Sequence, residues 1–203
     1  MEDKKELQNK VILMYEAVIS LIEEGKDINS IKVVDITSRA GIGKGTAYEY
    51  FKSKEEIIAN ALFYDLKKKC QEAIDAFSGE SNFKTLIYNM LDWVYQNINN
   101  KRTVYYMFKV ISNSYDINEN IKMHFASCTC DIAKNFDFVK HIAKVGIHDG
   151  TIPAGMDEYY YCVAIVSAFA GFIMFMHSCI KIEKVSVECA KDFAYNSIVK
   201  SLN

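Results

Sequence analysis

Apolar residues recur at steps of three and four along nearly the whole chain. The first such run begins at Leu7, passes through Val11 and Val18, and stops at Gly25. This spacing is the period of an amphipathic α-helix, so it predicts a helix over residues 4–24. The same pattern predicts further helices at about 30–40, 44–50, 53–77, 82–99, 101–112, 117–145, 157–180 and 186–201. The sequence has no alternating apolar and polar run of useful length, and it therefore predicts an all-α fold.

Capping residues and glycines mark where the first helices begin and end. Asn29 or Ser30 can cap the helix that follows the first loop, and Gly41 can take the left-handed backbone conformation that ends it. Ser53 and Glu56 have the spacing of a capping box. In that motif the Ser53 hydroxyl accepts a hydrogen bond from the Glu56 amide, and the Glu56 carboxylate accepts one from the Ser53 amide. The sequence thus predicts two short helices followed by a long one.

Composition bounds the kind of protein. The chain has 203 residues, enough for one or two domains, and half of them are apolar, which excludes a disordered polymer. Three glycines and the one proline fall in residues 146–155, which we predict as a loop. Six cysteines and a charged N-terminus without a signal-peptide pattern are typical of reduced thiols in a cytoplasmic protein.

Positive charge gathers in one short segment, although the formal net charge of the chain is −2. Residues 30–54 hold five Lys or Arg against two acidic residues, a local net of +3. They contain two predicted short helices joined by a glycine-bearing turn, the pattern of a helix-turn-helix. The second helix offers DNA an ammonium group, a hydroxyl and two phenols: Lys44, Thr46, Tyr48 and Tyr50. A solvated helical hairpin with no role in DNA binding would show the same spacing.

A longer pattern of fixed positions surrounds these groups. Residues 33–56 read V-x-D-I-x-x-x-A-G-I-G-K-G-T-x-Y-x-Y-F-x-x-K-E-E. Together with its flanks, from Leu13 to Ile58, this pattern resembles the N-terminal domain of the TetR family of one-component transcriptional regulators. The resemblance implies a helix-turn-helix DNA-binding domain over residues 1–52. It also implies a helical effector-binding and dimerisation domain over residues 53–203.

The same resemblance assigns roles to residues of the second short helix and its neighbour. The residues implied at the major groove are Lys44, Gly45 and Thr46, and those implied at phosphates are Tyr48, Tyr50 and Lys54. Two positions depart from the family pattern. Val34 stands where the family often has Arg or another polar residue, which removes one possible base contact. Tyr50 stands where the family often has His, and its phenol can still donate to a phosphate.

An uncharged run near the C-terminus allows two interpretations. Residues 159–180 contain no Asp, Glu, Lys or Arg, and this length is sufficient for a membrane span. However, the run includes Ser167, His177 and Ser178, and a further predicted helix follows it. A helix that is apolar all round is also expected where one face meets the core and the other meets a second subunit. In the resembled family the last two helices build a dimeric four-helix bundle, so we predict a homodimer and no membrane contact.

Candidate metal and catalytic residues are few. Cys128 and Cys130 are two apart on a predicted helix, so their thiols point about 200° apart and cannot face one ion. His124 and Cys128 share a face, but two ligands do not make a structural zinc site. The sequence also lacks a phosphate-binding glycine-rich loop, a nucleophile elbow and a metal-binding His-Glu helix motif. We therefore predict no metal, no cofactor and no enzyme activity.

Aromatic residues are dense beyond residue 80, and the inward stripes of several predicted helices carry both aromatic and polar groups. The predicted effector-binding residues are Trp93, Asn97, Tyr106, His124, Phe125, Cys128, Phe169, Phe172 and His177. Such a mixture suits a pocket for a small apolar or aromatic effector, although each of these residues could instead be plain core. We expect a repressor that the effector releases from palindromic operator DNA, with the helix from Ser53 transmitting the change. The alternative is a DNA-binding regulator controlled by a protein partner.

Overall fold

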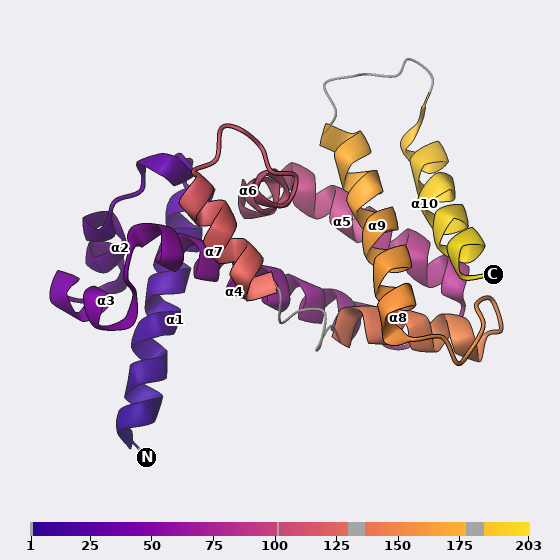
Figure 1. Ribbon diagram of the computed structural model, residues 1–203, viewed down its shortest axis with the longest axis horizontal. Coiled ribbons are helices and arrows are strands. Elements are labelled where there is room, and N and C mark those ends of the chain that lie inside the picture. Colours follow the sequence, from indigo (N-terminus) through magenta and orange to yellow (C-terminus); the bar gives the residue numbers. More distant parts are fainter. Residues whose placement is uncertain (1, 101, 130–136, 178–184) are drawn as a thin grey trace. The chain divides into compact units, whose positions relative to one another are not determined.

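The described part of the chain consists of helices joined by short connections (Figure 1). The structure is a computed structural model that describes residues 2–100, 102–129, 137–177 and 185–203. Its elements are α1 (Glu2–Glu23), the 3₁₀ turn η1 (Ile28–Ser30), α2 (Val33–Ala40), α3 (Lys44–Tyr50), α4 (Lys54–Ala76), α5 (Phe83–Asn100), α6 (Arg102–Ile111), α7 (Glu119–Thr129), α8 (Asp137–His148), α9 (Glu158–His177) and α10 (Val187–Leu202). No strand occurs in these ranges, and the all-α prediction is confirmed.

The helices form two compact units, and each unit consists of two separate segments of the chain. Unit 1 comprises residues 1–69 and 98–132, and unit 2 comprises residues 70–97 and 133–203. Helix α4 begins in unit 1 and ends in unit 2, whereas α6 and α7 belong to unit 1 together with α1, α2 and α3. Compactness is a different criterion from function, so the functional boundary between residues 52 and 53 remains a prediction.

Unit 1 has one apolar core to which both of its chain segments contribute. Met14 of α1, Ile36 of α2 and Leu62 of α4 are fully buried in it. Phe125 of α7 is buried in the same core, and its ring meets that of Phe63 edge to face at a centroid distance of 6.3 Å. The segment that carries α6 and α7 is therefore part of the same folded unit as the first three helices.

Unit 2 is built around α5, α8, α9 and α10. The fully buried Phe83 of α5 packs in a core shared with Ile142, Ile165 and Ile198 from the other three helices. Lys191 of α10 is also buried, and its ammonium pairs with the carboxylates of Asp92 and Glu188 at 2.8 and 2.7 Å. A phenol-to-carboxylate hydrogen bond from Tyr88 to Asp192 adds a second polar link between α5 and α10. These links fix α10 against α5 in addition to the apolar contacts.

Helix α9 corresponds to most of the uncharged run. Within the described ranges it is the one helix that is long and apolar enough to cross a membrane, over Glu158–Met176, and a third of the tested window is buried inside the protein. It packs side by side with α10 (Figure 1). Residues 178–180, which the prediction included in this helix, lie outside the described residues.

The predicted helix over residues 117–145 corresponds to two described helices. Helix α7 lies in unit 1 and α8 in unit 2. Residues 130–136, which separate them in the sequence and include Cys130, lie outside the described residues.

The prediction that the loop begins at Gly146 is wrong, because α8 continues to His148. Gly146 is buried, and a Cβ atom at this position would lie 2.7 Å from Cδ2 of Phe83 and 3.0 Å from Cδ1 of Ile152. The glycine therefore permits close helix packing, whereas the turn begins later and includes Gly150, at φ 78°. A glycine needed for close approach looks the same in a sequence as one needed for a turn.

We expect Gly146→Ala to lower the stability of the protein. Alanine gains about 1 kcal/mol of helix propensity, but a methyl group forced into a filled core costs about 1–3 kcal/mol. Because the Phe83 ring is fully buried and cannot move aside, the melting temperature should fall by a few degrees. Gly79→Ala, where no heavy atom lies within 4 Å of the new methyl group, is the matched control. Equal or higher thermal stability of Gly146→Ala would contradict this account of the packing.

Candidate DNA-binding site

The connection between α2 and α3 has the geometry of a helix-turn-helix. Gly41 takes the left-handed conformation, with φ 67° and ψ 29°, and ends α2 as predicted. The amide of Ile42 donates to the carbonyl of Thr37 at 2.9 Å and closes the helix end. Val33 and Ile36 of α2 and Ala47 of α3 are buried in the unit 1 core. This burial holds two short helices in a fixed relation.

The side chains of α3 divide into a buried and an exposed face. Lys44, Gly45 and Tyr48 are exposed, with half of the Tyr48 side chain open to solvent. Thr46 is half-buried, and Tyr50 packs against the core with its ring 6.5 Å from that of Phe51. The predicted groove residues and one predicted phosphate contact thus lie on the accessible side of the helix, while Tyr50 also contributes to packing.

Two ion pairs join this segment to residues that precede it. The guanidinium of Arg39 donates to both carboxylate oxygens of Glu24, and this hydrogen bonding lowers the pKa of Glu24. The ammonium of Lys26 lies 2.6 Å from Oδ2 of Asp35 and lowers the pKa of that carboxyl. Glu24 and Lys26 both lie outside the window counted in the sequence. Glu24 offsets the charge of Arg39 and Lys26 offsets that of Asp35, so the local net of +3 is unchanged.

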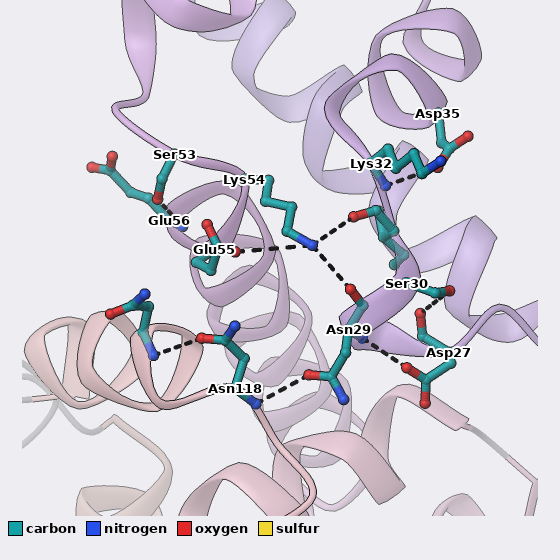
Figure 2. Close-up of polar contacts among 12 residues, drawn as sticks. Asp27, Asn29, Ser30, Lys32, Asp35, Ser53, Lys54, Glu55, Glu56 and Asn118 are labelled. Carbon is teal, nitrogen blue, oxygen red and sulfur yellow. Dashed lines mark hydrogen bonds and ion pairs between the residues drawn. The ribbon is translucent and has the colours of Figure 1, made fainter.

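Lys54 has an internal role that the sequence pattern did not indicate. Its ammonium donates to the carbonyl oxygens of Asn29 and Ile31, at 2.9 and 3.1 Å (Figure 2). It also lies 3.9 Å from a carboxylate oxygen of Glu55. An ammonium group has three N–H donors, so these two carbonyls use two of them. Lys54 therefore ties the start of α4 to the connection between α1 and α2, and its side chain is still 29% exposed.

The capping prediction at Ser53 is confirmed in one of its two hydrogen bonds. The Ser53 hydroxyl accepts from the amide of Glu56 at 3.1 Å. The Glu56 carboxylate instead accepts from the amide of Lys52, at 2.7 Å. The carboxylate thus satisfies a donor one residue before the predicted one, and it still secures the start of α4.

The prediction that Asn29 or Ser30 caps α2 is wrong. Both residues lie in η1, and α2 begins later, after Lys32, whose amide donates to Oδ2 of Asp35 at 2.8 Å. The Ser30 hydroxyl donates to the carbonyl of Asp27. The amide side chain of Asn29 is used in a contact with residues almost ninety positions away, and no local sequence signal could have indicated it.

The predicted effector residues fall into both units. Tyr106, His124, Phe125 and Cys128 belong to unit 1, and Trp93, Asn97, Phe169, Phe172 and His177 belong to unit 2. The four that are buried core residues are Tyr106, Phe125, Phe169 and Phe172. The Cys128 thiol donates to Oδ1 of Asn60 at 3.3 Å, and the Asn97 amide donates to the carbonyl of Trp93 at 2.9 Å. The side chain of His177 lies outside the described residues.

An apolar groove of about 740 Å³ runs along α9 and α10. Its lining includes four side chains that are largely exposed, namely Tyr159, Tyr160, Val163 and Phe193, at 67, 57, 44 and 76%. Of the predicted effector residues, Phe172 lies in this groove. Within the ranges that the structure covers, no group of three His, Cys, Asp or Glu side chains could hold a metal ion.

Comparisons with known proteins identify a family segment and a fold. The family model "Bacterial regulatory proteins, tetR family" matches residues 22–61. A TetR transcriptional regulator from Rhodococcus sp. RHA1 has a TM-score of 0.57 and 17% identity, over 97% of both chains. A putative TetR-family regulator from Syntrophomonas wolfei has a TM-score of 0.59 and 14% identity, over 97% of this chain and 96% of that one. Bacillus subtilis FadR in complex with stearoyl-CoA has a TM-score of 0.54 and 15% identity, over 95% and 99%.

The segment matched by the family model extends from the end of α1 into α4, so it contains the helix-turn-helix described above. No curated protein matches the sequence. The solved structures share too little sequence to show more than the fold, but they share it over nearly the whole chain. The two comparisons agree: residues 22–61 match the model of the tetR family of bacterial regulatory proteins, and the fold is that of solved TetR-family transcriptional regulators.

Proposed function

We propose that this protein is a ligand-responsive repressor that binds palindromic operator DNA as a homodimer in the cytoplasm. The observation that carries the proposal is the exposed face of α3 on a helix-turn-helix. Lys44, Gly45 and Thr46 would lie at the major groove, and Tyr48, Tyr50 and Lys54 would contact phosphates. A two-fold dimer presents two such helices, so the operator should contain two half-sites about one turn of DNA apart.

Removing polar groups of α3 should weaken binding to duplex DNA. An operator is first selected from random duplexes with the full chain, and its affinity is then measured by fluorescence anisotropy at several salt concentrations. Lys44→Ala removes a cation, so it should lower the affinity and reduce the slope of log affinity against log salt by about one. Because Lys44 is assigned to the major groove, it should also relax the preference at the base pair that it faces. Thr46→Ala should instead change the preference among operators, by about 1–3 kcal/mol at one base pair.

The exposed Lys52, just before α4, provides the control, since Lys52→Ala removes the same charge outside α3. The combined variant Lys44→Ala, Tyr48→Ala and Tyr50→Phe retains the Tyr50 ring that packs on Phe51. If this combined variant bound the selected duplex as tightly as the native protein, the assignment of α3 to DNA would be wrong.

The apolar groove on α9 and α10 supports the dimer. A soluble monomer would leave its exposed aromatic and aliphatic side chains in water, and patches of this kind mark interaction sites. The last two helices form the dimer interface in the resembled family. Two-fold symmetry would bring this face against a copy of itself.

Gly171→Arg should convert the dimer to monomers. Gly171 lines the groove, and no heavy atom of the chain lies within 4 Å of a Cβ placed there, so a single subunit has room for a longer side chain. In a dimer the guanidinium would be buried in an apolar interface without a partner, which is costly. Gly171→Ala is the matched control and should remain dimeric. Sedimentation velocity at micromolar concentration measures the result, and a monomeric native protein would contradict the interface.

The effector should be a small, largely apolar molecule. The predicted effector residues are mostly aromatic with a few polar groups, which is the mixture that binding pockets use. The FadR structure, which shares the fold, was solved with stearoyl-CoA, whose acyl chain is of this apolar kind. If a protein partner were the regulator instead, no small molecule would change the affinity for the operator.

Two substitutions test where the effector binds, one in each unit. A compound that releases the operator should also change the fluorescence of Trp93, the one tryptophan of the sequence. Cys128→Trp fills space in unit 1, and Phe169→Ala removes a buried ring from unit 2. At least one of them should abolish the response to the compound while operator binding persists. If every active compound released DNA from both variants as it does from the native protein, the predicted effector residues would be wrong.

A further inference from the structure

The end of α1 and the connection that follows it are hydrogen-bonded to the segment that carries α6 and α7, through Glu23, Asp27 and Asn29. At the first contact, the Glu23 carboxylate accepts from the amides of Arg102 and Thr103, both at 3.1 Å, and from the Thr103 hydroxyl at 2.8 Å. It thereby caps the start of α6. At the second, the Tyr106 phenol donates to Oδ2 of Asp27 at 3.2 Å. These contacts join the end of α1 and the connection after it to α6.

The third contact is made by Asn29. Its amide oxygen accepts from the backbone amide of Asn118 at 3.0 Å (Figure 2). Its amide nitrogen donates to the carbonyl of Asp116 at 2.8 Å. One side chain thus uses a donor and an acceptor on two backbone groups just before α7. The side chain of Asn118 accepts from the amide of Asn120, so it secures the start of α7.

The backbone of the same residue is held from the other side. The carbonyls of Asn29 and Ile31 accept from Lys54 at the start of α4, and the Asn29 amide donates to Asp27. Helix α2 begins two residues after Ile31. A shift of the 116–118 segment would therefore have to move Asn29 or break its two side-chain bonds, and moving Asn29 displaces the chain that leads directly into α2.

We propose that Asn29 is the positioning residue that couples the start of α7 to the helix-turn-helix. This inference rests on the proposed DNA-binding function. It adds a route that does not run along α4, the helix to which the sequence assigned the transmission of the effector's signal. Because coupling between two sites is reciprocal, DNA bound at α3 must then change the stability of the 116–121 backbone, and this change requires no knowledge of the effector.

Hydrogen exchange of the full chain tests the coupling, with and without the duplex selected on the native protein. In the native protein the duplex should slow exchange in residues 33–50, and it should also change exchange in residues 116–121 by about fivefold or more, the lower end of allosteric coupling. In Asn29→Ala the effect on 33–50 should remain while the effect on 116–121 disappears. If Asn29 had a purely structural role, Asn29→Ala would alter exchange equally with and without the duplex. The ratio of the two exchange rates in residues 116–121 would then equal that of the native protein.

Two further variants complete the experiment. Asn118→Ala is the matched control, because it removes a side chain at the same contact but keeps the backbone amide that Asn29 binds. In this variant the duplex should still change exchange in residues 116–121. Asn29→Asp keeps the acceptor but loses the donor to Asp116, so the duplex should no longer change exchange in residues 116–121. This variant replaces Asn29→Ala in the experiment if Asn29→Ala does not fold.

The outcomes separate this inference from the function on which it rests. Protection of 33–50 without a change at 116–121 in the native protein would overturn the coupling and leave DNA binding intact. A change at 116–121 that persists in Asn29→Ala or in Asn29→Asp would also overturn it. A duplex that protects 33–50 in no variant, the native protein included, would overturn DNA binding itself, and the coupling with it.

Discussion

Helices as short as α2 and α3, with eight and seven residues, have too few internal hydrogen bonds to be stable alone. Their arrangement therefore depends on the burial of a few side chains, Val33, Ile36 and Ala47, in the core of unit 1. The exposed groups of α3 keep their arrangement only as long as that core is intact. The remaining features of unit 1, from the cap at Ser53 to the bonds of Lys54, fix the surroundings of this pair of helices.

Polar side chains in both units join segments that are distant in the sequence. In unit 1, Glu23 and Asn29 satisfy backbone groups at the starts of α6 and α7, which would otherwise lack partners. In unit 2, the buried ammonium of Lys191 is matched by Asp92 and Glu188, as a buried charge requires. Since these bonds have defined donors and acceptors, they select one register of helix against helix, which apolar contacts alone specify less sharply.

Periodicity and local motifs predicted the helices well, because the spacing of apolar residues is set by which face each helix buries. The left-handed Gly41 and the hydroxyl cap of Ser53 were likewise predictable, since both depend on residues a few positions apart. Asn29 and Gly146 were not, because their roles depend on Asp116 and Phe83, which the fold alone brings near them. The polar and aromatic groups of α3 were expected to contact DNA because they match a family pattern. The predicted effector residues were instead inferred from the helix faces that point inward, and this criterion does not distinguish a core residue from one that lines a pocket.

The two segments of unit 1 are separated in the sequence by almost thirty residues that belong to unit 2. During synthesis the helix-turn-helix leaves the ribosome long before α6 and α7, and until then the core around Ile36 and Leu62 lacks Tyr106 and Phe125. The hydrogen bonds that Glu23, Asp27 and Asn29 make to this later segment are also unavailable to the growing chain. Helix α3 therefore reaches its final support only when α7 has been made, so a chain truncated before that point has the helix-turn-helix sequence without its complete folded unit.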